Sequence, residues 1–98
     1  MVKRKIDKKI KKVMGRFDFK KVHTVMKLFD WKWKIGDNLE VPSTKQIKEN
    51  AKRLLEQAYK NYRNNPKYVS LSTCGFEVRL DCGEIQFRFI LNEEYEEL

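Results

Sequence analysis

The stretch that decides the fold is residues 76–89, FEVRLDCGEIQFRF. Apolar and polar residues alternate on both sides of its centre, DCGE, which is typical of two strands joined by a tight turn. A loop of two or of four residues gives the same register, which sets Val78 opposite Phe87 on one face. That register also sets Glu77 opposite Arg88 on the other face, where the opposite charges attract. Because the apolar and charged pairs agree, the sequence predicts an antiparallel β-hairpin.

The hairpin needs further partners, because two strands alone are only marginally stable in water. Residues 68–72 form either a third strand or a lead-in to the first one. The hairpin must then pack on helices, or its sheet must extend through a second copy of the chain.

Residues 2–15 have the pattern of a basic amphipathic helix. Val2, Ile6, Ile10 and Val13 recur at the spacing of one helical face, and Gly15 suits a helix C-terminus. Lys and Arg occupy most of the positions between the apolar residues.

A second helix is predicted from about residue 19 to residue 30, with Asp18 as its N-cap. Its wide apolar face consists of Phe19, Val22, Val25, Met26, Leu28 and Phe29. The alternation of residues 31–35 indicates a short extended segment, and residues 36–38 indicate a turn.

The third helix has the clearest beginning. Ser43 is a good N-cap, and Gln46 completes a capping box three residues later. One face carries a long apolar stripe of Ile47, Ala51, Leu54, Leu55, Ala58 and Tyr62. Asn64, Asn65 and Pro66 end the helix.

These elements predict an α+β fold in one domain, residues 1–98, with three helices packed on a C-terminal antiparallel hairpin or small sheet. Residues 1–15 are either part of this domain or an appendage to it, and residues 92–98 form an acidic tail. The net charge of +8 is uneven, with 13 basic and 3 acidic residues in positions 1–34 against 2 basic and 7 acidic residues in positions 70–98. Charge asymmetry of this kind concerns partners and not the fold.

Several classes of protein are not expected. The chain has no apolar run long enough to span a membrane and no apolar signal core, so we expect an intracellular protein. Cys74 and Cys82 are near enough in sequence to pair in principle, but in an intracellular protein we expect two reduced, partly buried thiols. One histidine and two distant cysteines make no zinc site, and no phosphate loop or dinucleotide motif is present. We therefore expect no metal, no cofactor and no enzymatic activity.

The strongest binding pattern is the alternation of Trp31 and Trp33 with Lys32 and Lys34. In an extended segment, indole faces can stack on a base while lysines neutralise phosphates. In the other interpretation, one or both indoles anchor the neighbouring elements to the core.

Two further features are candidate ligand contacts. Residues 70–75 are rich in hydroxyls and end in glycine, so Ser72, Thr73 and Gly75 form either an anion-binding loop or an ordinary turn. His23 is either a ligand contact or a half-buried packing residue beside the apolar face of the second helix.

The basic N-terminal helix supports an alternative function, binding of nucleic acid through phosphates. The residues that would make these contacts are Lys3, Arg4, Lys5, Lys8, Lys9, Lys11, Lys12 and Arg16. The helix could also dock on an acidic protein or on the acidic tail of a second copy, or it could be a solvated charged helix. We do not expect it to bind a membrane, because no aromatic residue precedes Phe17.

From about residue 17 to residue 91 the chain resembles a family of small bacteriophage proteins without an assigned activity. The resemblance lies in Lys21-Val22-His23, Met26, Trp31-Lys32-Trp33, Val41-Pro42, Leu54, Ala58 and Gly75-Phe76. The family usually has Gly-Gly-Phe where this chain has Cys74-Gly75-Phe76. The resemblance implies a phage protein in the cytoplasm of a bacterial host, where small accessory proteins often counter host defence.

Pattern and resemblance together predict a homo-oligomeric, non-enzymatic accessory protein that binds an anionic ligand, as a sponge for a nucleotide signal or as an inhibitor of a host effector protein. The two alternatives are a nucleic-acid-binding protein that acts through residues 1–15 and an inhibitor of another protein.

Overall fold

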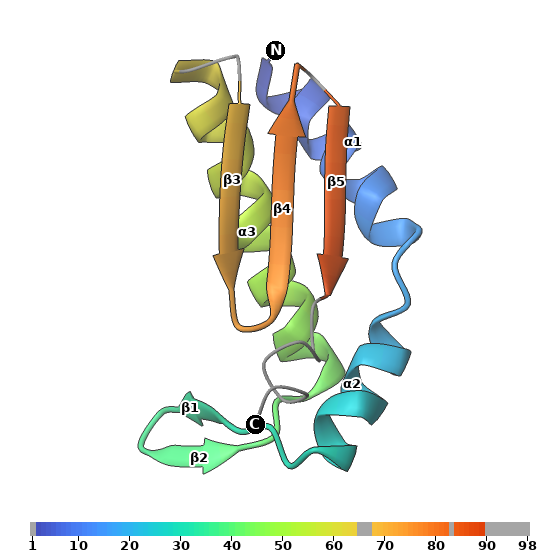
Figure 1. Ribbon diagram of the computed structural model, residues 1–98, viewed down its shortest axis with the longest axis vertical. Helices are drawn as coiled ribbons and strands as arrows, with labels where there is room; N and C mark the ends of the chain where they lie inside the picture. The colour runs from blue at the N-terminus through green and yellow to red at the C-terminus, as the bar shows by residue number, and fades with distance from the viewer. Residues whose placement is uncertain (1, 65–67, 83, 90–98) are drawn as a thin grey trace.

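The computed structural model describes residues 2–64, 68–82 and 84–89, with residues 2–5 described by their backbone. The elements follow the order α1 (Val2–Gly15), α2 (Phe19–Leu28), β1 (Trp33–Ile35), β2 (Asn38–Glu40), α3 (Thr44–Asn64), β3 (Tyr68–Thr73), β4 (Phe76–Asp81) and β5 (Glu84–Phe89). Strands β3, β4 and β5 form one sheet, α3 runs behind it, and β1 and β2 form a small hairpin beyond its lower end (Figure 1). The predicted α+β class is confirmed.

The sheet has the order β3-β4-β5 with both pairs antiparallel. The predicted register is confirmed, with Val78 opposite Phe87 and Glu77 opposite Arg88. Arg88 Nε donates a hydrogen bond of 2.9 Å to Glu77 Oε1, as the charge pattern indicated. Of the two interpretations for residues 68–72, the structure shows the strand.

A two-residue turn joins β3 to β4. Cys74 and Gly75 have φ angles of 50° and 89°, which suits a type I′ turn, and Cys82 has a φ of 52°. Side chains at such positions project from the end of a sheet, so both thiols are free and exposed. The prediction of partly buried cysteines is therefore wrong.

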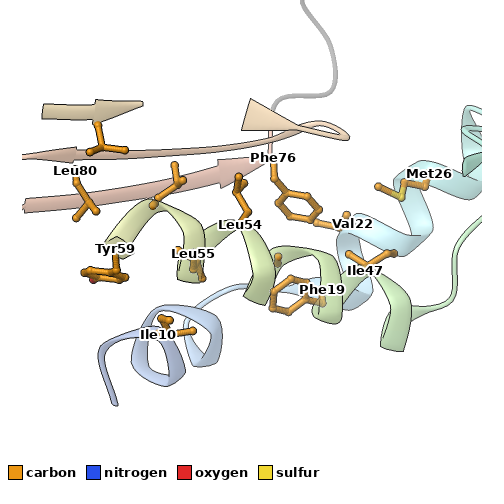
Figure 2. Packing of buried hydrophobic residues seen from close by; sticks show 14 residues of the cluster. Ile10, Phe19, Val22, Met26, Ile47, Leu54, Leu55, Tyr59, Phe76 and Leu80 are labelled. Carbon is orange, nitrogen blue, oxygen red and sulfur yellow. The ribbon is translucent and has the colours of Figure 1, made fainter. Parts of the chain in front are cut away.

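Helix α3 is the central element of the core. The predicted capping box is present, since the Ser43 amide donates to Gln46 Oε1 at 2.8 Å and the Gln46 amide donates to Ser43 Oγ at 3.2 Å. Six residues of α3 are buried, namely Ile47, Ala51, Leu54, Leu55, Ala58 and Tyr59. Tyr62, which was predicted on this face, is only partly buried. Figure 2 shows Leu54 directed towards the strands and Tyr59 on the opposite side of the helix, next to α1.

Helix α1 belongs to the core and is not an appendage. Its Ile10 is 2% exposed and lies in the same buried cluster as Leu55 and Tyr59. Ile6, Val13 and Met14 are partly buried against that cluster. Burial of one Ile side chain contributes about 1.5–3 kcal/mol, so this contact favours the packing of α1 on α3.

Helix α2 ends earlier than predicted, at Leu28, and its apolar face is narrower. Phe19, Val22 and Met26 are buried, but Leu28 is 77% exposed and Phe29 is 52% exposed. Leu28 lies about 180° around the helix axis from Phe19, so it cannot face the same core. Phe29 follows the last helical turn, where the chain leaves the helix. The prediction that these two residues complete the apolar face is wrong.

The hairpin of β1 and β2 was only half predicted. Strand β1 begins at Trp33, so the extended segment is shorter than the predicted residues 31–35. Residues 38–40 form a second strand, which was not predicted and which pairs with β1. The turn consists of Gly36 and Asp37, with Gly36 at a φ of 62°. A three-residue strand such as β2 has too few positions to show an alternating pattern.

Candidate anion-binding groove

The two tryptophans are packed on the protein and do not form an exposed stacking surface. Trp31 precedes β1, and its ring lies 5.6 Å from that of Phe89, centre to centre. Trp33 is half-buried, and its Nε1 atom is shielded from solvent. Both indoles contact the hydrophobic core, as the anchoring interpretation held.

Trp31 also covers the turn between β3 and β4. A Cβ atom at Gly75 would lie 2.5 Å from Trp31 Cη2 and 2.7 Å from Phe89 Cε1. The structure therefore brings together two residues that the sequence suggested as ligand contacts, Trp31 and Gly75. Their contact fills the space that a ligand would need, so its role is packing.

The other predicted ligand contacts are spread over the surface. Lys32 Nζ lies 3.6 Å from Asp30 Oδ2, and Lys34 is exposed opposite Leu39 on the small hairpin. Ser72 and Thr73 are in strand β3, which corrects the prediction of a hydroxyl-rich loop. His23 is half-buried on α2.

A groove of about 940 Å³ lies elsewhere, between α1, the beginning of α2 and the middle of α3. Its floor is apolar and its walls are charged. The lining residues are Asp7, Ile10, Lys11, Met14, Gly15, Phe17, Asp18, Phe19, Lys20, Lys48, Lys52 and Glu56. None of the eight residues predicted for the ligand site is among them.

The local sequence explains why the groove forms. Helix α1 ends at Gly15, and Asp18 begins α2 by accepting a hydrogen bond of 3.0 Å from the Lys21 amide. Residues 16–18 form the short connection between the two helices, and the half-buried Phe17 lines the groove there, with its ring 5.0 Å from that of Phe19, centre to centre. Lys48 and Lys52 are one turn apart on α3, so both reach the same wall.

Four lysines are the main electrostatic feature of the groove. Lys11, Lys20, Lys48 and Lys52 are all exposed, and within the described part of the chain none has a carboxylate oxygen within 4.0 Å of its Nζ. Asp7, Asp18 and Glu56 also line the groove, and Asp18 is engaged at the helix N-terminus. Unpaired ammonium groups in a concave surface attract anions more strongly than the same groups on a flat surface.

The residues of the nucleic-acid alternative are divided between the groove and the outer face of α1. Lys11 lines the groove, whereas Lys8, Lys9, Lys12 and Arg16 are exposed outside it. The side chains of Lys3, Arg4 and Lys5 lie outside the described residues, as does the acidic tail of residues 92–98.

Sequence reasoning missed Lys20, Lys48 and Lys52. The spacing of four between Lys48 and Lys52 was the available signal, since it places both on one side of α3. Nothing in the sequence indicated that this side faces α1.

A second charged cluster lies on the open face of the sheet. Glu77 Oε1 is 2.8 Å from Arg88 Nη2 and 3.4 Å from Arg79 Nε. Hydrogen bonding to Arg88 holds the pKa of Glu77 below its ordinary value of 4.5, and the positive charge of Arg79 acts in the same direction. Since Glu77 occupies both guanidinium groups, this cluster is less available to an anion than the groove lysines.

Among the helices described, none combines the length and apolar character needed to cross a membrane. In the same part of the chain, no three His, Cys, Asp or Glu side chains are grouped in a way that would hold a metal ion. No family model, curated protein or solved structure matches the chain. The resemblance to bacteriophage proteins therefore stays a prediction.

Proposed function

We propose that the protein is a non-enzymatic binding protein that holds a nucleotide in the groove between α1 and α3. The observation that carries the proposal is a set of four exposed lysines around an apolar floor, none of which has an ion-pair partner among the described residues. Ligand pockets commonly have volumes of about 300–1,000 Å³, so the groove has room for such a molecule.

The mixture of charges favours a nucleotide over a simple anion. Phosphate oxygens would accept hydrogen bonds from Lys48 and Lys52, and Met14 and Phe17 offer an apolar surface to a base or a sugar. The carboxylates of Asp7 and Glu56 would accept hydrogen bonds from ribose hydroxyls or base amino groups. A uniformly anionic polymer would be repelled by these same carboxylates.

The proposal assigns binding and no reaction to the groove. No Ser, Thr, Cys or His is among the described residues that line it, and the proposal gives its carboxylates and lysines the role of hydrogen-bonding partners. In the phage context that the resemblance implies, the ligand would be a nucleotide signal of the host, and the protein would counter defence by sequestering it.

Two methionine methyl groups allow a direct test. Met14 lines the groove, whereas Met26 is fully buried in the core. We expect ATP, cyclic AMP or a cyclic dinucleotide, added in turn, to shift the NMR signal of the Met14 methyl and to leave that of Met26 unchanged. Failure of all three nucleotides to shift Met14 selectively would contradict the proposal.

A matched pair of variants tests the role of the lysines. Lys48→Glu with Lys52→Glu reverses two charges in the groove, and Arg53→Glu with Lys60→Glu makes the same change at exposed positions of α3 outside it. Loss of two charge-assisted contacts corresponds to roughly tenfold weaker binding or more. The control variant should bind nearly as the natural protein does.

Nucleic-acid binding is the second candidate, because Lys8, Lys9, Lys12 and Arg16 extend the positive charge beyond the groove. It predicts binding of a single-stranded oligonucleotide that weakens steeply with salt. Lys8→Glu with Lys12→Glu, two exposed positions of α1 outside the groove, would then weaken binding at least as much as Lys48→Glu with Lys52→Glu, whereas nucleotide binding in the groove predicts the reverse order.

A further inference from the structure

The outer edge of strand β3 has free backbone groups. The register with β4 is continuous from Tyr68 opposite Asp81 to Thr73 opposite Phe76. A two-residue turn closes on a hydrogen-bonded pair, and such pairs alternate along antiparallel strands. The amides and carbonyls of Val69, Leu71 and Thr73 therefore bond to β4, and those of Tyr68, Ser70 and Ser72 point outwards. Among the described residues, β3 has no strand on its other side.

The sequence of β3, YVSLST, has none of the features that usually protect an edge strand. Natural edges carry charged residues, proline or bulges, which prevent pairing with another chain. Strand β3 has none of these, although 37% of the whole chain is charged. By contrast, β5 carries Glu84 and Arg88, and the small hairpin carries Lys34 and Glu40.

We infer that β3 is a dimer interface, at which it pairs antiparallel with β3 of a second copy of the chain. A two-fold axis at Ser70 sets Tyr68 opposite the partner subunit's Ser72 and Val69 opposite the partner subunit's Leu71. This register uses all the outward backbone groups and forms about six hydrogen bonds. The result is a continuous six-stranded sheet with the helices of both copies on one face.

Self-pairing fits this edge better than pairing with a different chain. The register keeps the faces of the two sheets aligned, so the half-buried Leu71 would be covered by the partner subunit's Val69. No charged side chain of β3 meets its own copy across the axis. The nearest cation on the open face, Arg79 opposite Ser70, is already close to Glu77. The inference does not depend on nucleotide binding.

The first test is the mass of the protein in solution. Ser70→Lys places two like charges opposite each other at the axis, and Gln86→Lys adds the same charge to β5. Ser70 and Gln86 are both exposed and both lie directly opposite Arg79, so each variant has the same local repulsion within a subunit. Light scattering after size exclusion should give a dimer for the natural chain and for Gln86→Lys.

The second variant, Ser70→Pro, removes an outward amide and leaves the ladder to β4 intact. Proline is tolerated on an edge strand when its nitrogen faces away from the sheet. Loss of the two symmetric hydrogen bonds should raise the dimer dissociation constant about tenfold or more, and Ser70→Lys should raise it in the same direction.

Hydrogen exchange of the natural chain provides a readout that needs no variant. In the dimer, the amides of Tyr68, Ser70 and Ser72 should exchange slowly. After dilution to the monomer, the same amides should exchange fast. The amides of Val69 and Leu71 should stay protected at both concentrations, because they bond to β4. A natural chain that is monomeric at all concentrations would overturn the inference, as would a dimer unaffected by Ser70→Pro or equally weakened by Gln86→Lys.

Discussion

The contact between Trp31 and the β3–β4 turn can be measured by changing Gly75 to alanine. The glycine has a φ of 89°, and an added Cβ would lie 2.5 Å from Trp31 Cη2. The left-handed conformation costs an alanine about 1–2 kcal/mol, and overpacking of a well-packed site costs about 1–3 kcal/mol more. Alanine also restricts the unfolded chain, which offsets about 0.4–1 kcal/mol. The expected loss is therefore about 1–4.5 kcal/mol.

Two other glycines provide matched controls. Gly36 has a φ of 62° but open space around it, so Gly36→Ala isolates the conformational term of about 0.5–1 kcal/mol. Gly15, in α1, has open space and no positive φ, so Gly15→Ala should stabilise the protein by about 0.5–1 kcal/mol. The free energy of unfolding should fall in the order Gly15→Ala, natural chain, Gly36→Ala and Gly75→Ala.

Urea denaturation followed by circular dichroism would measure the series. For a domain of about 100 residues, each 1 kcal/mol corresponds to roughly 4–8 °C in Tm, so thermal scans would resolve the same order. Combining Gly75→Ala with Trp31→Leu should recover part of the loss, because the shorter side chain makes room for the methyl group. Equal losses for Gly36→Ala and Gly75→Ala would refute the contact.

Two further predictions concern α1 and the sheet. Ile10→Ala should lower the free energy of unfolding by about 2–5 kcal/mol, because it leaves a cavity between α1 and α3. Helix α1 should loosen first, and the hydrogen exchange of its amides should become faster. An unchanged exchange pattern would contradict the packing of α1 on α3. Because the pKa of Glu77 is lowered in the folded state, its contribution is fully present above the ordinary value of 4.5 and is lost as pH falls through the lowered pKa. Stability should therefore decline with acid below about pH 5, and Glu77→Gln should decline less over the same range in parallel denaturation curves; identical slopes would contradict this assignment.

The sequence pattern was sufficient to predict those elements whose structure depends on residues close together in the chain. The capping box of Ser43 and Gln46 and the register of β4 with β5 depend on residues close in sequence or joined by a tight turn. The end of α2 was not predictable in this way. Helical spacing alone places Leu28 about 180° from Phe19, so the sequence could have excluded Leu28 from the core. Phe29 is outside the core because the helix ends before it, and the sequence does not mark that end.

The candidate site was harder to predict than the fold. Lys11, Lys20, Lys48 and Lys52 come from three helices, and they become neighbours only because Ile10 packs α1 on α3. The alternation of tryptophan and lysine predicted a ligand site at residues 31–34. The structure shows both indoles partly buried against the core. Large aromatic side chains are favoured in cores as well as in interfaces, so a short aromatic motif does not by itself separate packing from binding.

The two exposed cysteines have a consequence for oxidation. Cys74 precedes β4 and Cys82 follows it, so the six residues of that strand hold the thiols roughly 20 Å apart. A disulfide requires Cα atoms about 4.4–6.8 Å apart, which this rigid spacer forbids within one folded chain. Each folded chain thus presents one exposed thiol at either end of β4. Air oxidation should link separate chains into a ladder of covalent oligomers that a reducing agent returns to single chains.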